Sequence, residues 1–233
     1  MKKNILIFLC VSLLISCAQK SGSGNISNQT KTVGEFSGVK VAGGFEVEIK
    51  TGLAQSVVVE ADDNLIKYIN VNVVAGELKI SLDEISVRNA HLKVFITAPR
   101  ISSVKTSAGA EVVVKDELKS DKTINLSASS GSNIKAALDA PEVKVEVSSS
   151  GELELSGKTK DFHAKSSSGS SVAATGLLSE NSFVDVSSGG NVHVYASVSL
   201  DANASSGGNV YYRGGAASVK KSASSGGEIE MEK

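Results

Sequence analysis

A short run of small residues, Ser-Ser-Gly or a close variant of it, recurs seven times in this chain from residue 106 onward. The first glycines of the copies lie at positions 109, 131, 151, 169, 189, 207 and 226, so that successive copies are 22, 20, 18, 20, 18 and 19 residues apart. A period of about 20 residues is typical of a solenoid, in which each coil stacks on the one before it. The repeat therefore predicts an elongated stack of coils.

Apolar and polar residues alternate on both sides of each run, which is the period of a β-strand. One row of the same parity reads Val184, Val186, Ser188, Gly190, Val192 and Val194. Because this parity continues through the Ser-Gly run, we expect two strands per coil joined by a narrow passage, with Ser188 pointing inward. No segment keeps a helical period. The predicted fold class is therefore all-β, a β-solenoid with coils of about 20 residues.

In-register stacking of the coils would align the outward residues in columns. On the first strand of each coil these columns are Ser127, Glu146, Lys165, Asp185, Asn203, Ser222 and Asn125, Lys144, His163, Phe183, Asp201, Lys220. On the second strand they are Asn133, Glu152, Ser171, Asn191, Asn209, Glu228 and Lys135, Glu154, Ala173, His193, Tyr211, Glu230. The alternating charges in these columns are typical of a solvated face with cross-strand pairs.

The preceding segment, up to Arg100, has a weaker repeat but similar strand patterns. Residues 39–49 read as a diverged coil with Gly43 and Gly44 at its bend. Terminal coils of solenoids are irregular because they cap the core. We expect one domain over residues 33–233.

Four segments of this part carry a family resemblance. They are residues 36–47 (FSGVKVAGGFEV), 56–65 (SVVVEADDNL), 76–80 (GELKI) and 92–99 (LKVFITAP), followed by the Ser-Gly repeats. Together they resemble the head-GIN domain family of secreted or lipidated bacterial proteins, which carries an auto-transporter adhesin label. The resemblance covers nearly all of the chain after the N-terminal signal and implies a right-handed parallel β-helix. It supplies no catalytic residues and no established ligand.

The N-terminus has the features of a bacterial lipoprotein signal. Lys2 and Lys3 precede an apolar run over residues 5–15, which is too short to span a bilayer. The run ends in Leu-Ile-Ser-Cys17, which resembles a lipobox. We therefore predict a signal peptide over residues 1–16 and lipidation of Cys17. The alternative is an ordinary signal peptide with a chance cysteine.

Residues 17–32 are rich in Ser, Gly, Asn and Gln, and we predict that they form the lipidated cysteine and a flexible tether. Ala18 follows the cysteine, which by resemblance to lipoprotein sorting rules predicts an anchor in the outer membrane of a Gram-negative bacterium, on either its periplasmic or its outer face. Since Cys10 leaves with the signal and Cys17 takes the lipid, we expect no disulfide and no thiolate site.

The charge balance argues against a nucleic-acid partner. The chain has 24 basic and 25 acidic residues, and removal of Lys2 and Lys3 leaves 22 basic residues and a net charge of −3. No basic surplus is present to bind phosphates.

The sequence shows no convincing catalytic or metal site. Glu152 and Glu154 share a face, but their context is the solvated ladder. The three histidines, at positions 91, 163 and 193, fall on different columns, whereas a zinc site would need them to converge. Asp62-Asp63-Asn64 reads as a polar turn rather than a calcium loop. We therefore predict no enzyme activity and no cofactor.

One local enrichment of aromatic and donor groups includes His193, Tyr211 and Arg213, which we name as candidate ligand contacts. The alternative is an aromatic ladder that stabilises the late coils. The leading hypothesis is a lipid-anchored envelope module that binds a glycan or a protein. The competing hypotheses are a structural envelope protein without a ligand and, third, a carbohydrate-active β-helix enzyme. We expect a monomer or weak dimer, with Glu228, Glu230 and Glu232 repelling end-to-end contacts.

Overall fold

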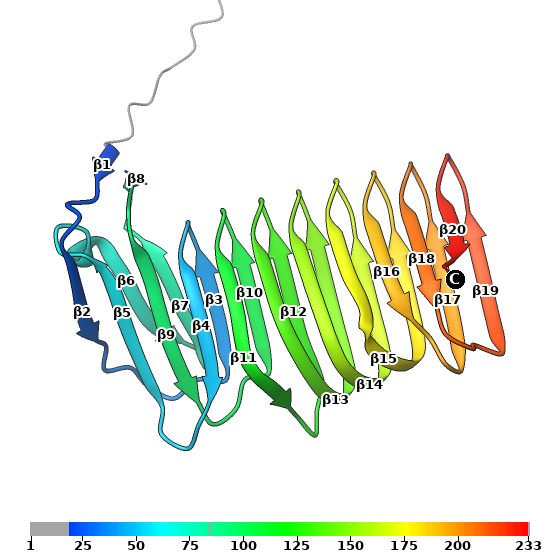
Figure 1. Cartoon of the computed structure of the whole chain (residues 1–233), viewed down its shortest axis with the longest axis horizontal. Helices are drawn as coiled ribbons and strands as arrows, with labels where there is room; N and C mark the ends of the chain where they lie inside the picture. The colour runs from blue at the N-terminus through cyan, green and yellow to red at the C-terminus, as the bar shows by residue number, and fades with distance from the viewer. Residues whose placement is uncertain (1–18, 84, 233) are drawn as a thin grey trace, which may run out of the picture.

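A computed structural model describes residues 19–83 and 85–232 as an elongated all-β stack (Figure 1). The strands lie side by side along the long axis and form two walls that face each other across a narrow core. The walls are continuous because the long strands β13 (Asn133–Ser148), β14 (Glu152–Ser166) and β15 (Ser171–Val186) bend from one wall into the other. The prediction of a β-solenoid is thus confirmed.

Wall I contains the first strand of each coil. In spatial order it consists of β6 (Ile69–Val74), β7 (Glu77–Leu82), β3 (Gly38–Ala42), β10 (Ser103–Ser107), β12 (Ile124–Ser129), the second halves of β13, β14 and β15, β17 (Ser199–Ala204) and β19 (Ser218–Ala223).

Wall II contains the second strand of each coil. In spatial order it consists of β2 (Ile26–Thr30), β5 (Ser56–Asp62), β9 (Leu92–Ala98), β4 (Glu46–Thr51), β11 (Glu111–Lys119), the first halves of β13, β14 and β15, β16 (Asn191–Tyr195), β18 (Asn209–Arg213) and β20 (Glu228–Met231).

From β10 onward the coils stack in parallel and in register. Partners in one column, such as Asn133, Glu152, Ser171, Asn191, Asn209 and Glu228, follow each other at intervals of 18 to 20 residues. All four outward columns predicted from the sequence are present with the residues expected. The inward residues are mostly Val, Leu, Ile and Ala, and they are buried in a single core.

The Ser-Gly runs form the pointed tips along one edge of the stack (Figure 1). At the tip between β15 and β16, Ser188 and Gly189 both have positive φ, of 50° and 71°, and the N–H of Gly190 donates to the carbonyl of Ser187 at 2.9 Å. This is the geometry of a tight two-residue turn. The tips also bond to each other, since the N–H of Gly189 donates to the carbonyl of Ser206 in the next coil.

The expected inward position of Ser188 is therefore wrong, because its side chain is exposed at the tip. The turn has two residues, so it leaves the odd-even parity of the flanking strands unchanged, and the sequence pattern could not reveal it. Gly190 is the residue that points inward, as expected. A Cβ atom there would lie 2.8 Å from Ser166 Oγ and 2.9 Å from the Ser166 carbonyl carbon, so the walls are too close for a side chain.

Serine occupies the same inward position in other coils, and there the hydroxyl is satisfied by neighbouring backbone. Ser170 is buried, and its Oγ lies 2.9 Å from the carbonyl oxygen of Val147 and 2.8 Å from that of Ser167, so that its single hydroxyl hydrogen can donate to either. The same Oγ accepts a bond from the N–H of Ser167 at 3.0 Å. The buried hydroxyl therefore has the partners that burial requires.

The N-terminal end is a cap of rearranged strands. β3 and β4 form the expected diverged coil and pair in parallel with β10 and β11. The layer beyond them comes from β7 and β9, later in the chain, and the outermost layer pairs antiparallel through β2, β5 and β6. A short 3-10 helix, η1 (Ile66–Tyr68), connects β5 to β6.

The prediction of a flexible tether over residues 17–32 is wrong for the part that the structure describes. β1 (Gln19–Ser21) pairs in parallel with β8 (Ser86–Arg88), and β2 pairs antiparallel with β5. Buried Asp62 accepts bonds from the N–H groups of His91 and Gly24, both at 2.7 Å, and these bonds hold its pKa below the usual range. Cys17 lies outside the described residues.

At the C-terminal end of the stack, the last strand of wall I carries a charged residue at an inward position. Lys221 continues the inward column after Ala202, and its ammonium lies 4.5 Å from the centre of the Tyr212 ring. An inward charge on a terminal strand opposes edge-to-edge pairing. The expected row of three repelling acids is only partly present. A hydrogen bond with Glu230 raises the pKa of Glu228, whereas Glu232 is bound by Arg213.

The turn geometry predicts opposite effects for two neighbouring substitutions. Gly190→Ala should destabilise the fold by roughly 1–3 kcal/mol, because its Cβ overlaps the backbone of the preceding coil. Ser188→Gly should be neutral or slightly stabilising, because glycine adopts positive φ without steric cost. Thermal unfolding followed by circular dichroism separates the two variants, and equal losses would contradict the turn assignment.

The inward lysine predicts an effect on association. Lys221→Val should promote self-association of the chain, because it extends the apolar core to the open end. Lys220→Val, which adds the same side chain on the outer face one residue away, is the matched control. Light scattering at equal concentrations measures the difference, and a Lys221→Val variant as monodisperse as the wild type would show that Lys221 does not guard this end.

Candidate functional site

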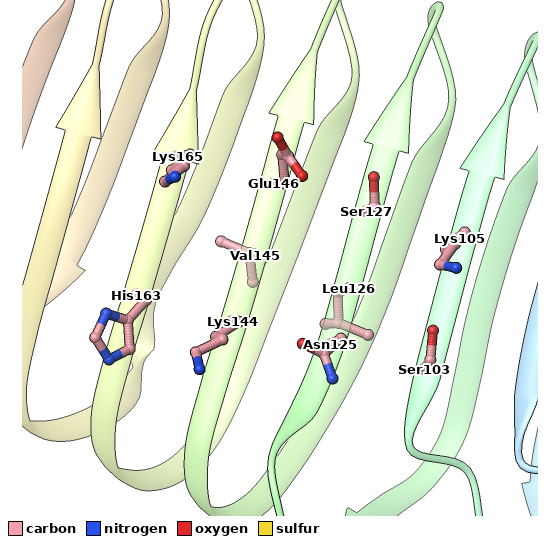
Figure 2. Close-up of a pocket in the computed structure, with 10 residues that line it drawn as sticks. All are labelled: Ser103, Lys105, Asn125, Leu126, Ser127, Lys144, Val145, Glu146, His163 and Lys165. Carbon is pink, nitrogen blue, oxygen red and sulfur yellow. The ribbon is translucent and has the colours of Figure 1, made fainter.

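A groove crosses the outer face of wall I over β10, β12, β13 and β14 (Figure 2). It has a volume of about 610 Å³. The short side chains of Ser103, Asn125 and Ser127 lie between longer ones, and this difference in length hollows the face. Parts of Leu126 and Val145 reach the floor. The groove is thus a consequence of which residue types stand in the two outward columns.

The rim of this groove is rich in charge. Lys105 forms an ion pair with Glu77 at 2.7 Å, and Lys144 pairs with Glu142 at 2.9 Å. A hydrogen bond from the Thr123 hydroxyl, and then one from Lys144, holds the pKa of Glu142 below its usual range. Among the residues that the structure describes, Lys165 has no carboxylate within 4 Å of its ammonium. Its charge is therefore available to a ligand.

An exposed aromatic pair lies at one side of the groove. The rings of His163 on β14 and Phe183 on β15 stack with centroids 4.6 Å apart and planes 10° apart. Phe183 remains 40% exposed, although it is a large apolar side chain on a solvated face. His163 Nε2 lies 3.4 Å from Glu142 Oε1. The pair presents a flat ring surface beside polar groups.

A second hollow of about 320 Å³ continues the groove toward β17. It shares Glu146 and Lys165 with the first. Serine side chains line its other side, contributed by Ser148, Ser167, Ser187 and Ser205. Asn203 Nδ2 donates to Asp185 Oδ1 at 2.9 Å across it. We call the two hollows together the axial groove, because they run along the long axis of the stack.

The ligand contacts predicted from the sequence lie on the opposite wall. His193 on β16 stacks on Tyr211 of β18, with ring centroids 4.8 Å apart. Glu232 accepts a bond from Arg213 Nε at 3.0 Å, and its other oxygen lies 2.8 Å from His193 Nδ1. The structure thus brings the three residues together, but it engages their polar groups in holding the C-terminal segment. Their geometry matches the stabilising alternative.

The acidic residues and histidines considered above as catalytic or metal-binding candidates do not come together in one site. Glu154 is paired with Lys135 at 2.6 Å. His91 lies 2.8 Å from Glu60, and each of the three histidines has a different carboxylate neighbour. No group of three or more His, Cys, Asp or Glu among the described residues could hold a metal ion. Within the same residues, no helix is long and apolar enough to cross a membrane.

The His163–Phe183 pair is not among the ligand contacts predicted from the sequence, although its signal is present there. The predicted column places these residues on adjacent strands, and the structure confirms their register. His163 and Phe183 are 20 positions apart in the chain, so they form no local aromatic enrichment and become neighbours only across the coils. In a solenoid, residues that are one coil apart in the sequence are in contact, so aromatic clusters have to be identified along the columns.

Three solved structures share this fold. A "putative adhesin" from Bacteroides fragilis is 19% identical, covers 91% of this chain and 100% of its own length, and has a TM-score of 0.84. A "Putative lipid binding protein" from Parabacteroides distasonis is also 19% identical, over 93% and 100% of the two chains, with a TM-score of 0.75. A "putative adhesin" from Parabacteroides merdae is 20% identical, over 92% and 99%, with a TM-score of 0.68. A comparison with curated proteins found no match.

At these identities the solved structures establish the fold and leave the ligand open. A family profile matches residues 35–216, which is most of the chain, under the description "Putative auto-transporter adhesin, head GIN domain". The resemblance expected from the segments between residues 36 and 99 is thereby confirmed, and the chain belongs to the head GIN domain family.

Proposed function

We propose that this protein is a non-enzymatic binding module of the bacterial cell envelope that holds a glycan, or a glycan-bearing protein, in the axial groove. The observation that carries the proposal is the stacked His163–Phe183 pair, which stays exposed beside a polar groove. The apolar face of a sugar ring stacks on such a pair, while its hydroxyls bond to Ser, Asn and Lys side chains. The adhesin description of the family agrees with this role.

The rigidity of the wall supports the same proposal. Each outward side chain in the groove stands on a strand that is bonded on both sides to neighbouring coils. A site built on regular strands is pre-organised, so that binding costs little ordering of the protein. An extended surface of this kind suits an extended ligand.

The site of action follows from the N-terminal signal. We propose that Cys17 carries the lipid and anchors the protein in the outer membrane. Gln19 already belongs to β1, and two residues span at most about 7 Å. The lipid would therefore hold the capped N-terminal end close to the membrane, with the stack projecting from it.

A structural envelope protein without a dedicated ligand is the second candidate. The contacts of His193 and Arg213 with Glu232 favour it, because contacts of this kind stabilise the C-terminal segment. The axial groove distinguishes the two candidates. Stacking of Phe183 on His163 can stabilise the wall in either case, but only a binding module uses the ring surface of Phe183 that stays 40% exposed beside the groove.

The anchor predicts a change of location. Cys17→Ser should move the protein from the membrane fraction to the soluble fraction, because the acyl chains supply the stable attachment. Cell fractionation with immunoblotting measures this distribution. A variant that stays in the membrane fraction at the wild-type level would overturn the lipobox assignment.

The groove predicts specific loss of glycan binding. The full chain, purified in detergent, should bind members of a glycan array, and Phe183→Ala should weaken binding about fivefold through loss of ring stacking. Tyr211→Ala, which removes a ring from wall II, is the matched control and should bind normally. The proposal fails if no glycan binds, or if Tyr211→Ala reduces binding as much as Phe183→Ala.

A further inference from the structure

A column of lysines extends the axial groove toward the N-terminal end of wall I. Lys79 on β7, Lys40 on β3 and Lys105 on β10 occupy successive in-register positions. Their outward column then passes Ser127, Glu146 and Lys165, which line the groove. We call Lys79, Lys40 and Lys105 the lysine column.

The lysine column places like charges on adjacent strands, whereas several lysines elsewhere in the solenoid are paired with carboxylates. Neighbouring strands are about 4.8 Å apart, and like charges directly opposite each other destabilise a sheet. Other lysines face carboxylates on adjacent strands, as in Lys93–Glu48 at 3.0 Å and Lys220–Asp201 at 3.0 Å. Within the lysine column, Lys105 is the one lysine with a carboxylate partner among the described residues, namely Glu77 at 2.7 Å.

Two of the three positive charges in this column, those of Lys40 and Lys79, have no close carboxylate in the part of the chain that the structure describes. Within residues 19–83 and 85–232, no carboxylate lies within 4 Å of the ammonium of Lys40 or Lys79. The whole chain has a net charge of −1, so the column does not reflect a generally basic surface. Adjacent ammonium groups repel each other and do not stabilise the fold. An anionic ligand bound over them would relieve this repulsion.

We propose that the axial groove binds a linear acidic polysaccharide that runs along the long axis of the stack. Its carboxylates or sulfates lie on the lysine column, and one of its rings stacks on His163 and Phe183. The inference rests on the proposed function and names the class of glycan.

The dimensions fit such a ligand. Six strand steps separate Lys79 on β7 from Phe183 on β15, through β3, β10, β12, β13 and β14. At about 4.8 Å a step this distance is about 29 Å. A sugar unit in an extended chain is close to one strand step in length. The site therefore spans about six sugar units, and short oligomers reach only one end of it.

The side chains favour a polysaccharide over a nucleic acid. Single-stranded nucleic acids are bound by successive aromatic rings on which the bases stack. The axial groove offers one aromatic pair, and its polar lining includes the hydroxyls and amide of Ser103, Asn125 and Ser127. These groups match the hydroxyls of a sugar chain better than the faces of bases.

The test uses the full chain, purified in detergent, and isothermal titration. The probes are acidic oligosaccharides of polygalacturonate and alginate with about eight units, the same oligomers with about three units, and the neutral methyl esters. Single-stranded DNA of equal charge is the competing polyanion. We expect the long acidic oligomers to bind more tightly than the short oligomers, the esters and the DNA, with an affinity that falls as salt rises.

The variant pair is Lys40→Gln/Lys79→Gln against Lys50→Gln/Lys160→Gln. The control removes the same charge from exposed lysines outside the groove. The first variant should lose about tenfold in affinity for the long acidic oligomers, about threefold per lysine, whereas the control should bind as the wild type. Its melting temperature should be equal to the wild-type value or higher, because repulsion is relieved, so a loss of affinity is not a loss of fold.

Three outcomes overturn the inference. They are acidic oligomers that bind no more tightly than their esters, equal losses in both variants, and DNA binding with the same sensitivity to Lys40 and Lys79. The proposed function survives the first of these if the esters bind and Phe183→Ala weakens them. It fails together with the inference only if no glycan binds at all.

Discussion

The structure depends on one constraint, the in-register parallel stacking of coils through backbone hydrogen bonds. The register makes every outward residue the neighbour of the residue 18 to 20 positions before and after it, so a surface property arises from a column rather than from a local motif. The tight turns keep that register, because their N–H groups bond from one tip to the next. The inward glycines let the two walls close over a narrow core. The groove, the aromatic pair and the lysine column are all consequences of this arrangement.

Much of the fold could be predicted from the sequence because the two-residue alternation of the strands and the repeat of about 20 residues indicate the same structure. Strand alternation assigned the inward Val, Leu and Ala residues, and the repeat fixed the neighbours in all four outward columns. The prediction failed at Ser188, because a two-residue turn and a continuing strand have the same parity. It failed again at the tether, where polar composition suggested flexibility. There, distant partners such as Asp62 and β5 order the N-terminal segment.

The candidate site was less predictable than the fold. The patch of His193, Tyr211 and Arg213 was visible along the chain, but its polar groups are engaged by Glu232, whose approach follows from the path of the last coil. The groove on wall I results from contrasts in side-chain length between strands, which a linear reading does not display. The lysine column includes Lys79 and Lys40, and its order in space differs from its order in the chain because the cap rearranges the first strands. Only the assembled cap places them beside Lys105.

If the proposal is right, the outer face of wall I, and not wall II, holds the ligand. Lysine acylation footprinting, read by mass spectrometry with and without a bound glycan, measures which wall is covered. We expect the ligand to protect Lys105 and Lys165 in the groove and to leave Lys135 on wall II as reactive as before. Protection of Lys135, with Lys105 and Lys165 unchanged, would contradict the proposal.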